Sequence, residues 1–320
     1  MPRLNLKSKR LSVSAEVPDA VARQLHHLRN RVRGIATNGN GNEAQTGALT
    51  IAKRLPEFRV TGRDALEAVK FYRRVHDAAD ADEVVAGDLS SAVSQLFWYH
   101  TIELPGGVVT PGLYDHRPLV PHYGLPERMD GMRALDVATF DGFWAFEMER
   151  RGGDVVAADI DRFAACDFPP QVRQAILDQG LDRDTGLGFR LAQEALASKV
   201  DRIQRSIYDL DPADVGTFDL VHVADLLIHL ERPLEALRAV RRVTRGTALI
   251  ADCFDPALEP GAVRYMGAWT DVPWWLPSLE TLGQMVVDAG FASVELRMVY
   301  ALASRGEERG HWRASLVATA

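Results

Sequence analysis

The sequence is poor in the features that would place it outside the ordinary globular proteins. Its 320 residues include only two cysteines, Cys166 and Cys253, which excludes a disulfide framework and leaves no cysteine spacing for a metal. No apolar run approaches the roughly 20 residues that cross a bilayer. The N-terminus is basic, but no apolar stretch follows that would make it a secretory signal. These absences predict a cytoplasmic protein with no membrane partner.

Excess positive charge is also missing. The formal net charge is −7, and hydrophobic residues make up 47% of the chain, enough for a large core. A nucleic-acid partner held by bulk charge is therefore disfavoured, although a local basic patch stays open. Basic residues gather in the first 33 positions, and the stretch 34–47 is rich in Gly, Asn and Thr. We expect 1–50 to be a basic, partly disordered arm and linker.

Two stretches before residue 100 have apolar residues at helical spacing, namely 63–79 and 88–98. Between residues 99 and 126, five prolines and four glycines exclude a long helix or a central strand. That stretch also contains three histidines and three tyrosines, which is typical of an ordered binding loop rather than a spacer. We therefore expect 51–130 to be a helical extension with a loop that covers a cofactor.

From residue 131 onward the apolar pattern alternates between strands and helices. The expected strands are 134–139, 154–160, 202–209, 218–225, 247–254, 294–303 and 312–318, and the expected helices are 143–151, 188–198, 233–243 and 278–289. This alternation predicts an α/β fold over 131–320 with a Rossmann-like, doubly wound, mostly parallel sheet. Because no helix separates the last two strands, they should form a C-terminal antiparallel hairpin.

The turn after the first strand, within "ALDVATFDGFWAF", has few of the glycines that a nucleotide-binding turn usually contains. Only Gly142 remains; we expect Ala138 to replace a glycine whose φ is negative, and Phe140 stands where the middle glycine would be. Asp159 ends the second strand, 23 positions after Asp136. A carboxylate there can accept hydrogen bonds from both hydroxyls of a ribose. The structural alternative is an aspartate that caps the next helix.

Ligands of open α/β sheets bind outside the carboxyl ends of the strands, so the residues at those ends are the candidates. The expected cofactor-binding residues there are Asp136, Ala138, Thr139, Phe140, Gly142, Asp159, Ile160, Asp161, Tyr208, Asp209 and Ala224.

The order and spacing of these motifs over about 98–320 resemble the class I S-adenosylmethionine-dependent methyltransferases. The segment "LDVATFDG" is similar to that family's first motif, and Asp159 matches the acid on the ribose. Tyr208 and Asp209 match the pair that flanks the adenine. The resemblance implies S-adenosyl-L-methionine as the cofactor. A nicotinamide-binding domain, the competing interpretation, would have a fuller G-x-G-x-x-G after the first strand.

A closer resemblance is to the bacterial tRNA wobble-uridine carboxymethyltransferases. It rests on "DLLIHLERPLEALRAVRRV" and "WWLPSLETLGQMVVDAGFASVELR". It implies that Arg313 holds the extra carboxylate of carboxy-S-adenosylmethionine and that Tyr114 lies in the cofactor pocket. The lysine and tyrosine of that carboxylate site are His100 and Ile228 here. Since a buried carboxylate needs paired charge or several hydrogen bonds, these departures favour plain S-adenosylmethionine.

Methyl transfer depends on orientation and, for a hydroxyl acceptor, on a base near the methyl group. The candidate catalytic residues are His229, just beyond the fourth strand, and His100 and Glu103 in the loop before the first strand. The candidate substrate contacts are His116, Trp274 and Trp275. Each of these also has an interpretation as a packing residue. No His/Cys/Asp spacing predicts a metal site.

Three functions stay open, of which a methyltransferase for an oxygen or nitrogen of a small molecule or natural product is favoured. The second is a tRNA-modifying enzyme whose basic surface would include Arg117, Arg238, Arg241, Arg242 and Arg245. The third is a non-catalytic binding protein with a degenerate turn. The acidic net charge favours the first, because RNA affinity depends on cations that contact phosphates. The acceptor and a homo-oligomeric state stay open.

Overall fold

The computed structural model describes residue 65, residues 88–268 and residues 273–320. Contacts divide the chain into two units, Met1–Asp64 and Ala65–Ala320, and the described residues all belong to the second. The predicted basic arm over 1–50 lies outside the described residues, as does the predicted helix over 63–79 apart from residue 65.

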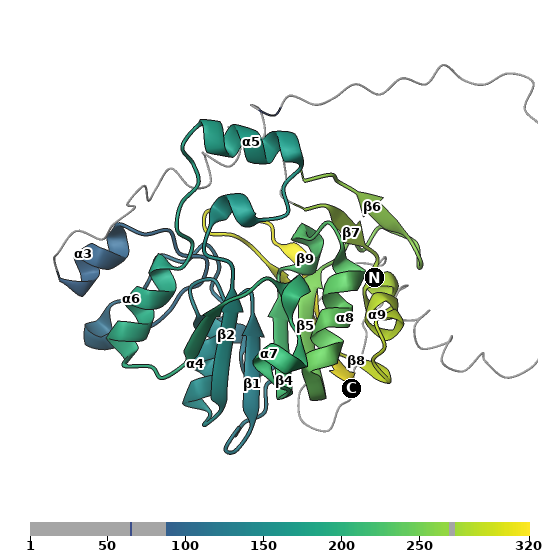
Figure 1. Ribbon diagram of the computed structural model, residues 1–320, viewed down its shortest axis with the longest axis horizontal. Helices are drawn as coiled ribbons and strands as arrows, with labels where there is room; N and C mark the ends of the chain where they lie inside the picture. Colours follow the sequence, from purple (N-terminus) through teal and green to yellow (C-terminus); the bar gives the residue numbers. More distant parts are fainter. Residues whose placement is uncertain (1–64, 66–87, 269–272) are drawn as a thin grey trace, which may run out of the picture. The chain divides into compact units, whose positions relative to one another are not determined.

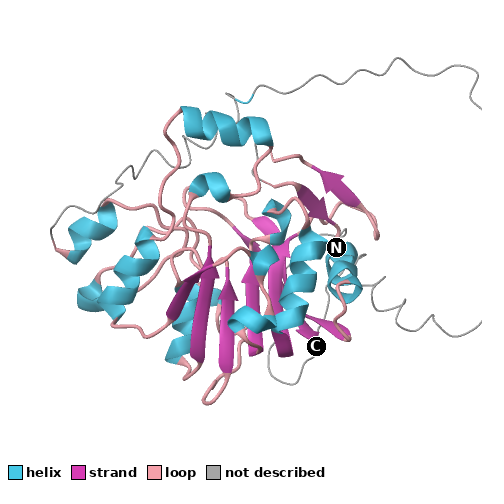
Figure 2. Ribbon diagram, in the orientation of Figure 1, coloured by secondary structure: helices cyan, strands magenta, loops and turns pink. Residues whose placement is uncertain are grey.

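The centre of the second unit is a seven-stranded sheet (Figures 1 and 2). Its strands are β1 (Arg133–Val137), β2 (Asp154–Asp159), β3 (Asp201–Gln204), β4 (Phe218–Ala224), β5 (Thr244–Cys253), β8 (Ser293–Leu302) and β9 (His311–Thr319). They lie in the order β3-β2-β1-β4-β5-β9-β8, with β1 to β5 parallel and β9 antiparallel to both β5 and β8. The predicted parallel sheet with an antiparallel C-terminal hairpin is therefore confirmed. A separate antiparallel pair comprises β6 (Val263–Tyr265) and β7 (Trp275–Pro277).

Helices connect and cover the strands. They are α3 (Leu89–Ser94), α4 (Phe143–Arg150), α5 (Pro170–Asp178), α6 (Leu187–Leu196), α7 (Pro212–Val215), α8 (Pro233–Val243) and α9 (Leu279–Asp288). Helix α4 contacts β1 and β2, whereas α8 contacts β4, β5 and α9. Helix α5 lies beyond the carboxyl ends of the parallel strands (Figure 1). None of the helices in the described ranges is long and apolar enough to cross a membrane.

Two predicted elements are shorter than expected because local hydrogen bonds end them. The helix predicted over 88–98 ends at Ser94. Beyond it, the carbonyl oxygen of Trp98 accepts a hydrogen bond from the N–H of Leu113 in the covering loop. The strand predicted over 202–209 ends at Gln204, and Ile207–Asp209 form a single 3-10 turn capped by the Ser206 hydroxyl. Helix α5 was not predicted from the sequence.

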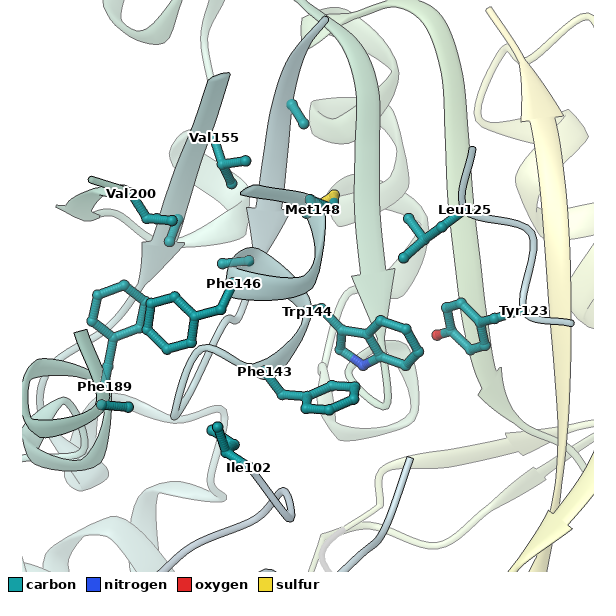
Figure 3. Close-up of a cluster of buried hydrophobic side chains, with 14 of the residues drawn as sticks. Ile102, Tyr123, Leu125, Phe143, Trp144, Phe146, Met148, Val155, Phe189 and Val200 are labelled. Carbon is teal, nitrogen blue, oxygen red and sulfur yellow. The ribbon is translucent and has the colours of Figure 1, made fainter. Parts of the chain in front are cut away.

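The covering loop, residues 99–126, contributes to the main hydrophobic core rather than lying loosely on it. Ile102, Tyr123 and Leu125 of this loop belong to the same buried cluster as Trp144 of α4, and Tyr123 stacks on Trp144 with ring centroids 4.0 Å apart (Figure 3). Full burial of a large apolar side chain stabilises a fold by roughly 1.5–3 kcal/mol. The loop is thereby anchored at its far end.

Gly142 is the N-cap of α4 and has φ of +91°, a backbone conformation that favours glycine. A Cβ atom at this position would lie 2.5 Å from Cε2 of Phe146 and 2.7 Å from Cδ2 of Phe189. Helices α4 and α6 therefore approach the turn so closely that only glycine fits there.

The substitution Gly142→Ala should lower the free energy of unfolding by about 2–4 kcal/mol, from overpacking together with left-handed strain. Urea denaturation would measure it. The matched control is Gly180→Ala, at φ of +64° with nothing within 4 Å, which should lose only about 1 kcal/mol. Equal losses in the two variants would contradict the packing role of Gly142.

Candidate functional site

A cavity of about 300 Å³ lies at the carboxyl ends of β1, β2 and β4. A smaller cavity of about 100 Å³ adjoins it and shares the wall formed by Ala138, Asp159, Cys166, Asp167 and His229. This is the edge at which open α/β sheets bind their ligands.

The structure brings together about half of the predicted site residues. Those lining the larger cavity are Asp136, Ala138, Thr139, Phe140, Asp159, Ile160, Ala224, His100 and His229, and Tyr208 lines the smaller one. Those outside the walls of both cavities are Glu103, Gly142, Asp161, Asp209, Tyr114, Arg313, His116, Trp274 and Trp275.

Two residues of the turn between β1 and α4 have a left-handed backbone conformation. Ala138 has φ of +56° and Phe140 has φ of +48°. The expectation that Ala138 replaces a glycine of negative φ is therefore wrong: the alanine keeps a conformation that costs roughly 1 kcal/mol or more in an L-residue. The ring of Phe140 packs edge-on against Phe97 and Tyr99, with centroids 6.0 and 6.1 Å away, and so forms part of the cavity wall.

Asp159 stabilises this turn. Its carboxylate accepts hydrogen bonds from the N–H groups of Phe140 and Ile160, both at 2.7 Å. It does not cap the next helix, so the structural alternative raised by the sequence does not hold. Burial raises the pKa of Asp159 to about 6, against the two backbone hydrogen bonds, which lower it.

Asp136 lines the cavity, but both of its carboxylate oxygens are engaged within the protein. Thr139 donates to one from 2.7 Å, and His222 Nδ1 lies 2.7 Å from the other. His222 is the register partner of Asp136 on β4, and its Nε2 lies 3.1 Å from the Tyr123 hydroxyl. Asp136 therefore links β1 to the turn and to His222 of β4. The alternating pattern of "FDLVHVAD" was the only signal that could have placed His222 on the same face.

Asp141 joins the covering loop to the turn, a role that the sequence did not reveal. Its carboxylate accepts the backbone N–H groups of Tyr99 and His100, both at 2.8 Å, and it also bonds His100 Nδ1. The His100 ring stacks on Phe143, with centroids 5.3 Å apart. The imidazole of His100 is therefore fixed in the cavity wall.

A buried polar cluster around Asp225 lies at the cavity wall, which Asp225 and Tyr99 line. Arg313 Nε donates to Asp225 Oδ1 at 2.6 Å, and the Tyr99 hydroxyl donates to Oδ2 at 3.0 Å. The Arg313 guanidinium also lies 4.8 Å from the ring centre of Tyr114. Arg313, which the resemblance assigned to the cofactor, thus pairs with a carboxylate of the chain itself, and Tyr114 lies against the Arg313 guanidinium. Burial alone would raise the pKa of Asp225, but the charge of Arg313 and the contact with His116 hold it well below its usual range.

Asp225, Asp252 and Cys253 place ligand atoms within 4.8 Å of one another. Asp252 accepts three backbone N–H groups, from Leu226, Leu227 and Cys253, and Asp225 pairs with Arg313. Because these donors already occupy the carboxylates, we assign no metal to this group.

Four other predicted residues that line neither of these two cavities have contacts within the protein. Glu103 is exposed and pairs with Arg117 at 2.6 Å, and Asp161 pairs with Arg202 at 2.6 Å. The indole of Trp274 donates to the carbonyl of Asp167. The Trp275 indole donates to the Glu231 carbonyl at 3.2 Å, and its ring lines a separate apolar cavity of about 400 Å³ beside α8 and α9. The predicted catalytic role of Glu103 and the predicted substrate contacts of the tryptophans are not supported by this placement.

Comparison with family models gives a match over the parallel part of the sheet. Residues 135–251 match the family model described as a methyltransferase domain. The match runs from β1 to β5, and so contains the left-handed turn, Asp159 and Asp225. A search of curated proteins found no match.

Solved structures with a similar backbone are distant relatives at most. The N-terminal domain of EvdMO1, crystallised with SAH and D-fucose, is 16% identical with a TM-score of 0.48, covering 70% of this chain and 91% of its own. Magnesium protoporphyrin IX methyltransferase from Synechocystis PCC 6803 is 15% identical with a TM-score of 0.39, covering 59% and 70%. The 1,6-didemethyltoxoflavin-N1-methyltransferase of Burkholderia thailandensis is 18% identical with a TM-score of 0.39, covering 63% and 77%. At these scores, they support no conclusion about the reaction or the acceptor.

His116 packs behind the cavity, with Nε2 3.7 Å from Asp225. Burial lowers its pKa from 6.5 to about 4, although the contact with Asp225 raises it. In this pH range the unfolded chain binds a proton that the folded chain does not, so stability falls as the pH falls. Between pH 6.5 and 4, the native protein should lose about 3 kcal/mol more of its unfolding free energy than His116→Gln does. Urea titrations across this range test this; parallel curves for the two proteins would contradict the lowered pKa.

Proposed function

We propose that the protein transfers the methyl group of S-adenosylmethionine to an oxygen or nitrogen atom of a small-molecule acceptor. The observation that carries the proposal is the position of Asp159 at the end of β2, in the wall of both cavities. A carboxylate offers about four acceptor sites. Two accept the N–H groups of Phe140 and Ile160, which leaves two for the pair of ribose hydroxyls. The match to a methyltransferase domain supports the same cofactor.

In this proposal, the adenine end of the cofactor lies in the smaller cavity and the methionine end lies in the larger one. The smaller cavity, with Ile160, Ile207 and Leu226 among its lining residues, suits the flat adenine ring. The larger one brings the turn around Thr139 together with Ala224 at the end of β4, where the methionine portion and the acceptor would meet. Because β1, β2 and β4 are rigid parallel neighbours, the reacting groups are oriented before the reaction begins.

In the reaction, a lone pair of the acceptor attacks the sulfonium methyl carbon. The carbon–sulfur bond breaks, its electron pair stays on sulfur, and S-adenosylhomocysteine is released. A hydroxyl acceptor must also lose a proton. His229 lines both cavities just beyond β4 and is our candidate for that base. His100 is held through Nδ1 by Asp141 and stacked on Phe143, so we assign it to positioning the wall.

The basic residues proposed for a tRNA surface have other contacts. Arg241 donates to the Gly290 carbonyl, Arg242 to the Leu210 carbonyl, and Arg245 pairs with Asp219 at 2.6 Å. Arg245 lies near the start of β5, at the amino edge of the parallel strands and opposite the cavity. Arg313, the remaining one of the three residues expected to hold a carboxymethyl group, pairs with Asp225. These contacts favour the small-molecule acceptor over tRNA.

Replacing Asp159 with alanine should weaken binding of S-adenosylhomocysteine about tenfold or more, because a charge-assisted hydrogen bond to the ribose is lost. Isothermal calorimetry measures it. The matched control is Asp154→Ala, which removes an exposed carboxylate from the opposite end of the same strand and should leave the affinity unchanged. If Asp159→Ala binds as tightly as the native protein, the ribose assignment fails. Absence of binding by the native protein would favour a non-catalytic protein.

The acceptor class can be tested with methyl-labelled S-adenosylmethionine, a panel of phenols, carboxylic acids and amines, and bulk tRNA. We expect label in a small molecule and none in tRNA. With a hydroxyl acceptor, His229→Ala should lower kcat about 100-fold without changing cofactor affinity, as is usual for loss of a general base. His311→Ala, at an exposed position at the start of β9, is the control. Label in tRNA would overturn the acceptor class, and an unchanged kcat in His229→Ala would exclude His229 as the base.

A further inference from the structure

The short strand β6 leaves one of its edges open. It pairs with β7 and with no other strand in the described part of the chain, and it lies on the outside of its unit (Figure 1). Just outside the strand, Ala262 and Met266 form backbone hydrogen bonds to residues that flank or adjoin β7. Since bonded and non-bonded positions alternate in an antiparallel pair, the backbone N–H and C=O groups of Val263 and Tyr265 point away from β7.

The side chains of the same two residues add an apolar surface to this edge. Val263 is 44% exposed and Tyr265 is 58% exposed. The Tyr265 ring packs against Trp275 of β7 with centroids 5.1 Å apart, and Val263 lines the apolar cavity of about 400 Å³ beside α8 and α9. Leu234 of α8, which is also exposed, lines the same cavity. An exposed apolar patch beside an open strand edge is typical of an interaction surface.

Arg264, the middle residue of β6, brings no unpaired charge to this edge. Its guanidinium Nη2 lies 2.6 Å from Oδ2 of Asp255, a largely buried carboxylate of the same chain. Because successive side chains of a strand alternate between its two faces, Arg264 lies on the face opposite Val263 and Tyr265. Two copies of Arg264 can therefore face each other across a strand pair, since each charge is balanced within its own chain.

We propose that β6 pairs with β6 of a second copy of this chain about a two-fold axis, which makes the protein a homodimer. With Arg264 on the axis opposite its own copy, Val263 of each copy faces Tyr265 of the other. Each of these two pairs exchanges two backbone hydrogen bonds, so all the outward-pointing groups of both strands are satisfied. Pairs of a β-branched and an aromatic side chain stabilise antiparallel strands.

A second copy fits this edge better than an unrelated strand does. A two-fold interface uses the same surface twice, so that surface must be complementary to itself. The edge of β6 meets this condition, because one register satisfies its backbone groups, places both apolar pairs and sets the balanced Arg264 on the axis. A strand of another protein would satisfy the backbone groups alone unless its sequence also matched.

The proposed interface lies beside the candidate site without including it. Leu227 and Ile228 line the apolar cavity and directly precede His229 in the chain. Trp274, just before β7, donates its backbone N–H to the Ile228 carbonyl at 2.6 Å. The homodimer does not depend on the proposed function, so binding of S-adenosylhomocysteine can be confirmed where the homodimer is not, and the reverse.

Light scattering after size-exclusion chromatography, over a dilution series of the full chain, measures the mass and the dissociation constant. We expect a dimer for the native protein. Val263→Lys places a charge in both apolar pairs, so the dissociation constant should rise about 100-fold, as the product of two tenfold losses. The matched control is Val109→Lys, the same change at a 46% exposed position of the covering loop, which should leave the dissociation constant unchanged.

A native protein that is monomeric at every soluble concentration would overturn the inference and leave the open edge to a strand of another protein. An unchanged dissociation constant in Val263→Lys, or an equal rise in both variants, would also overturn it.

Cross-linking tests the register separately. A non-bonded pair on the axis brings two β carbons to about 4.5 Å, near the distance that a disulfide spans, so Arg264→Cys should form a linked dimer under mild oxidation. Tyr265→Cys faces Val263 rather than its own copy and should cross-link much less. Non-reducing electrophoresis distinguishes the two variants, and the opposite order of yields would contradict the two-fold pairing.

Discussion

The ion pair between Asp225 and Arg313 is the interaction on which the arrangement of the site depends. Asp225 follows β4, and Arg313 lies on β9, the strand that joins the antiparallel hairpin to the parallel sheet. The same carboxylate receives the Tyr99 hydroxyl from the covering loop. Removing one member of a buried pair typically costs 3–5 kcal/mol, because the other charge stays buried without a partner. Hairpin, sheet and loop are therefore fixed to one another at the edge of the cavity.

The strained turn between β1 and α4 persists because several hydrogen bonds from neighbouring segments hold its backbone in place. Ala138 in the left-handed region donates its N–H to the Ala158 carbonyl at 2.8 Å, and Phe140 donates to Asp159. Hydrogen bonds on each side of the turn thus hold Ala138 and Phe140 in a left-handed conformation that glycine would adopt without strain. The acid that holds Phe140 is also the acid proposed for the ribose, so the turn and the cofactor share one anchor.

The sequence was a good guide to the sheet because strand patterning is local. Alternating and continuous apolar runs identified β1 to β5 and the final hairpin, and the position of Asp159 at the end of β2 followed from counting along the chain. The sign of φ at Ala138 did not follow, since alanine gives no local indication of the left-handed conformation.

The sequence did not show which side chains contact one another in the folded chain. A motif match assigned Arg313 to a ligand carboxylate, yet a carboxylate 88 positions earlier in the chain takes its Nε hydrogen bond. Trp274 was similarly expected to meet a substrate, but it meets the Asp167 carbonyl. Charged and aromatic side chains contact whatever the fold brings near, and those neighbours come from distant segments. Asp141 and His222 were missed for the same reason: each bonds a residue at least 40 positions away.

The segment between β2 and α6 contributes residues to the walls of both cavities. It has a small core of its own, in which Phe163 and Phe168 meet Val172 and Ile176 of α5. Asp182 ties its two ends together by accepting hydrogen bonds from Arg162 and from the Ala164 N–H. A segment with its own core can present a fixed side chain to the cavity, whereas a bare loop could not. The segment therefore gives the larger cavity a wall with its own packing, to which Cys166, Asp167 and Phe168 contribute.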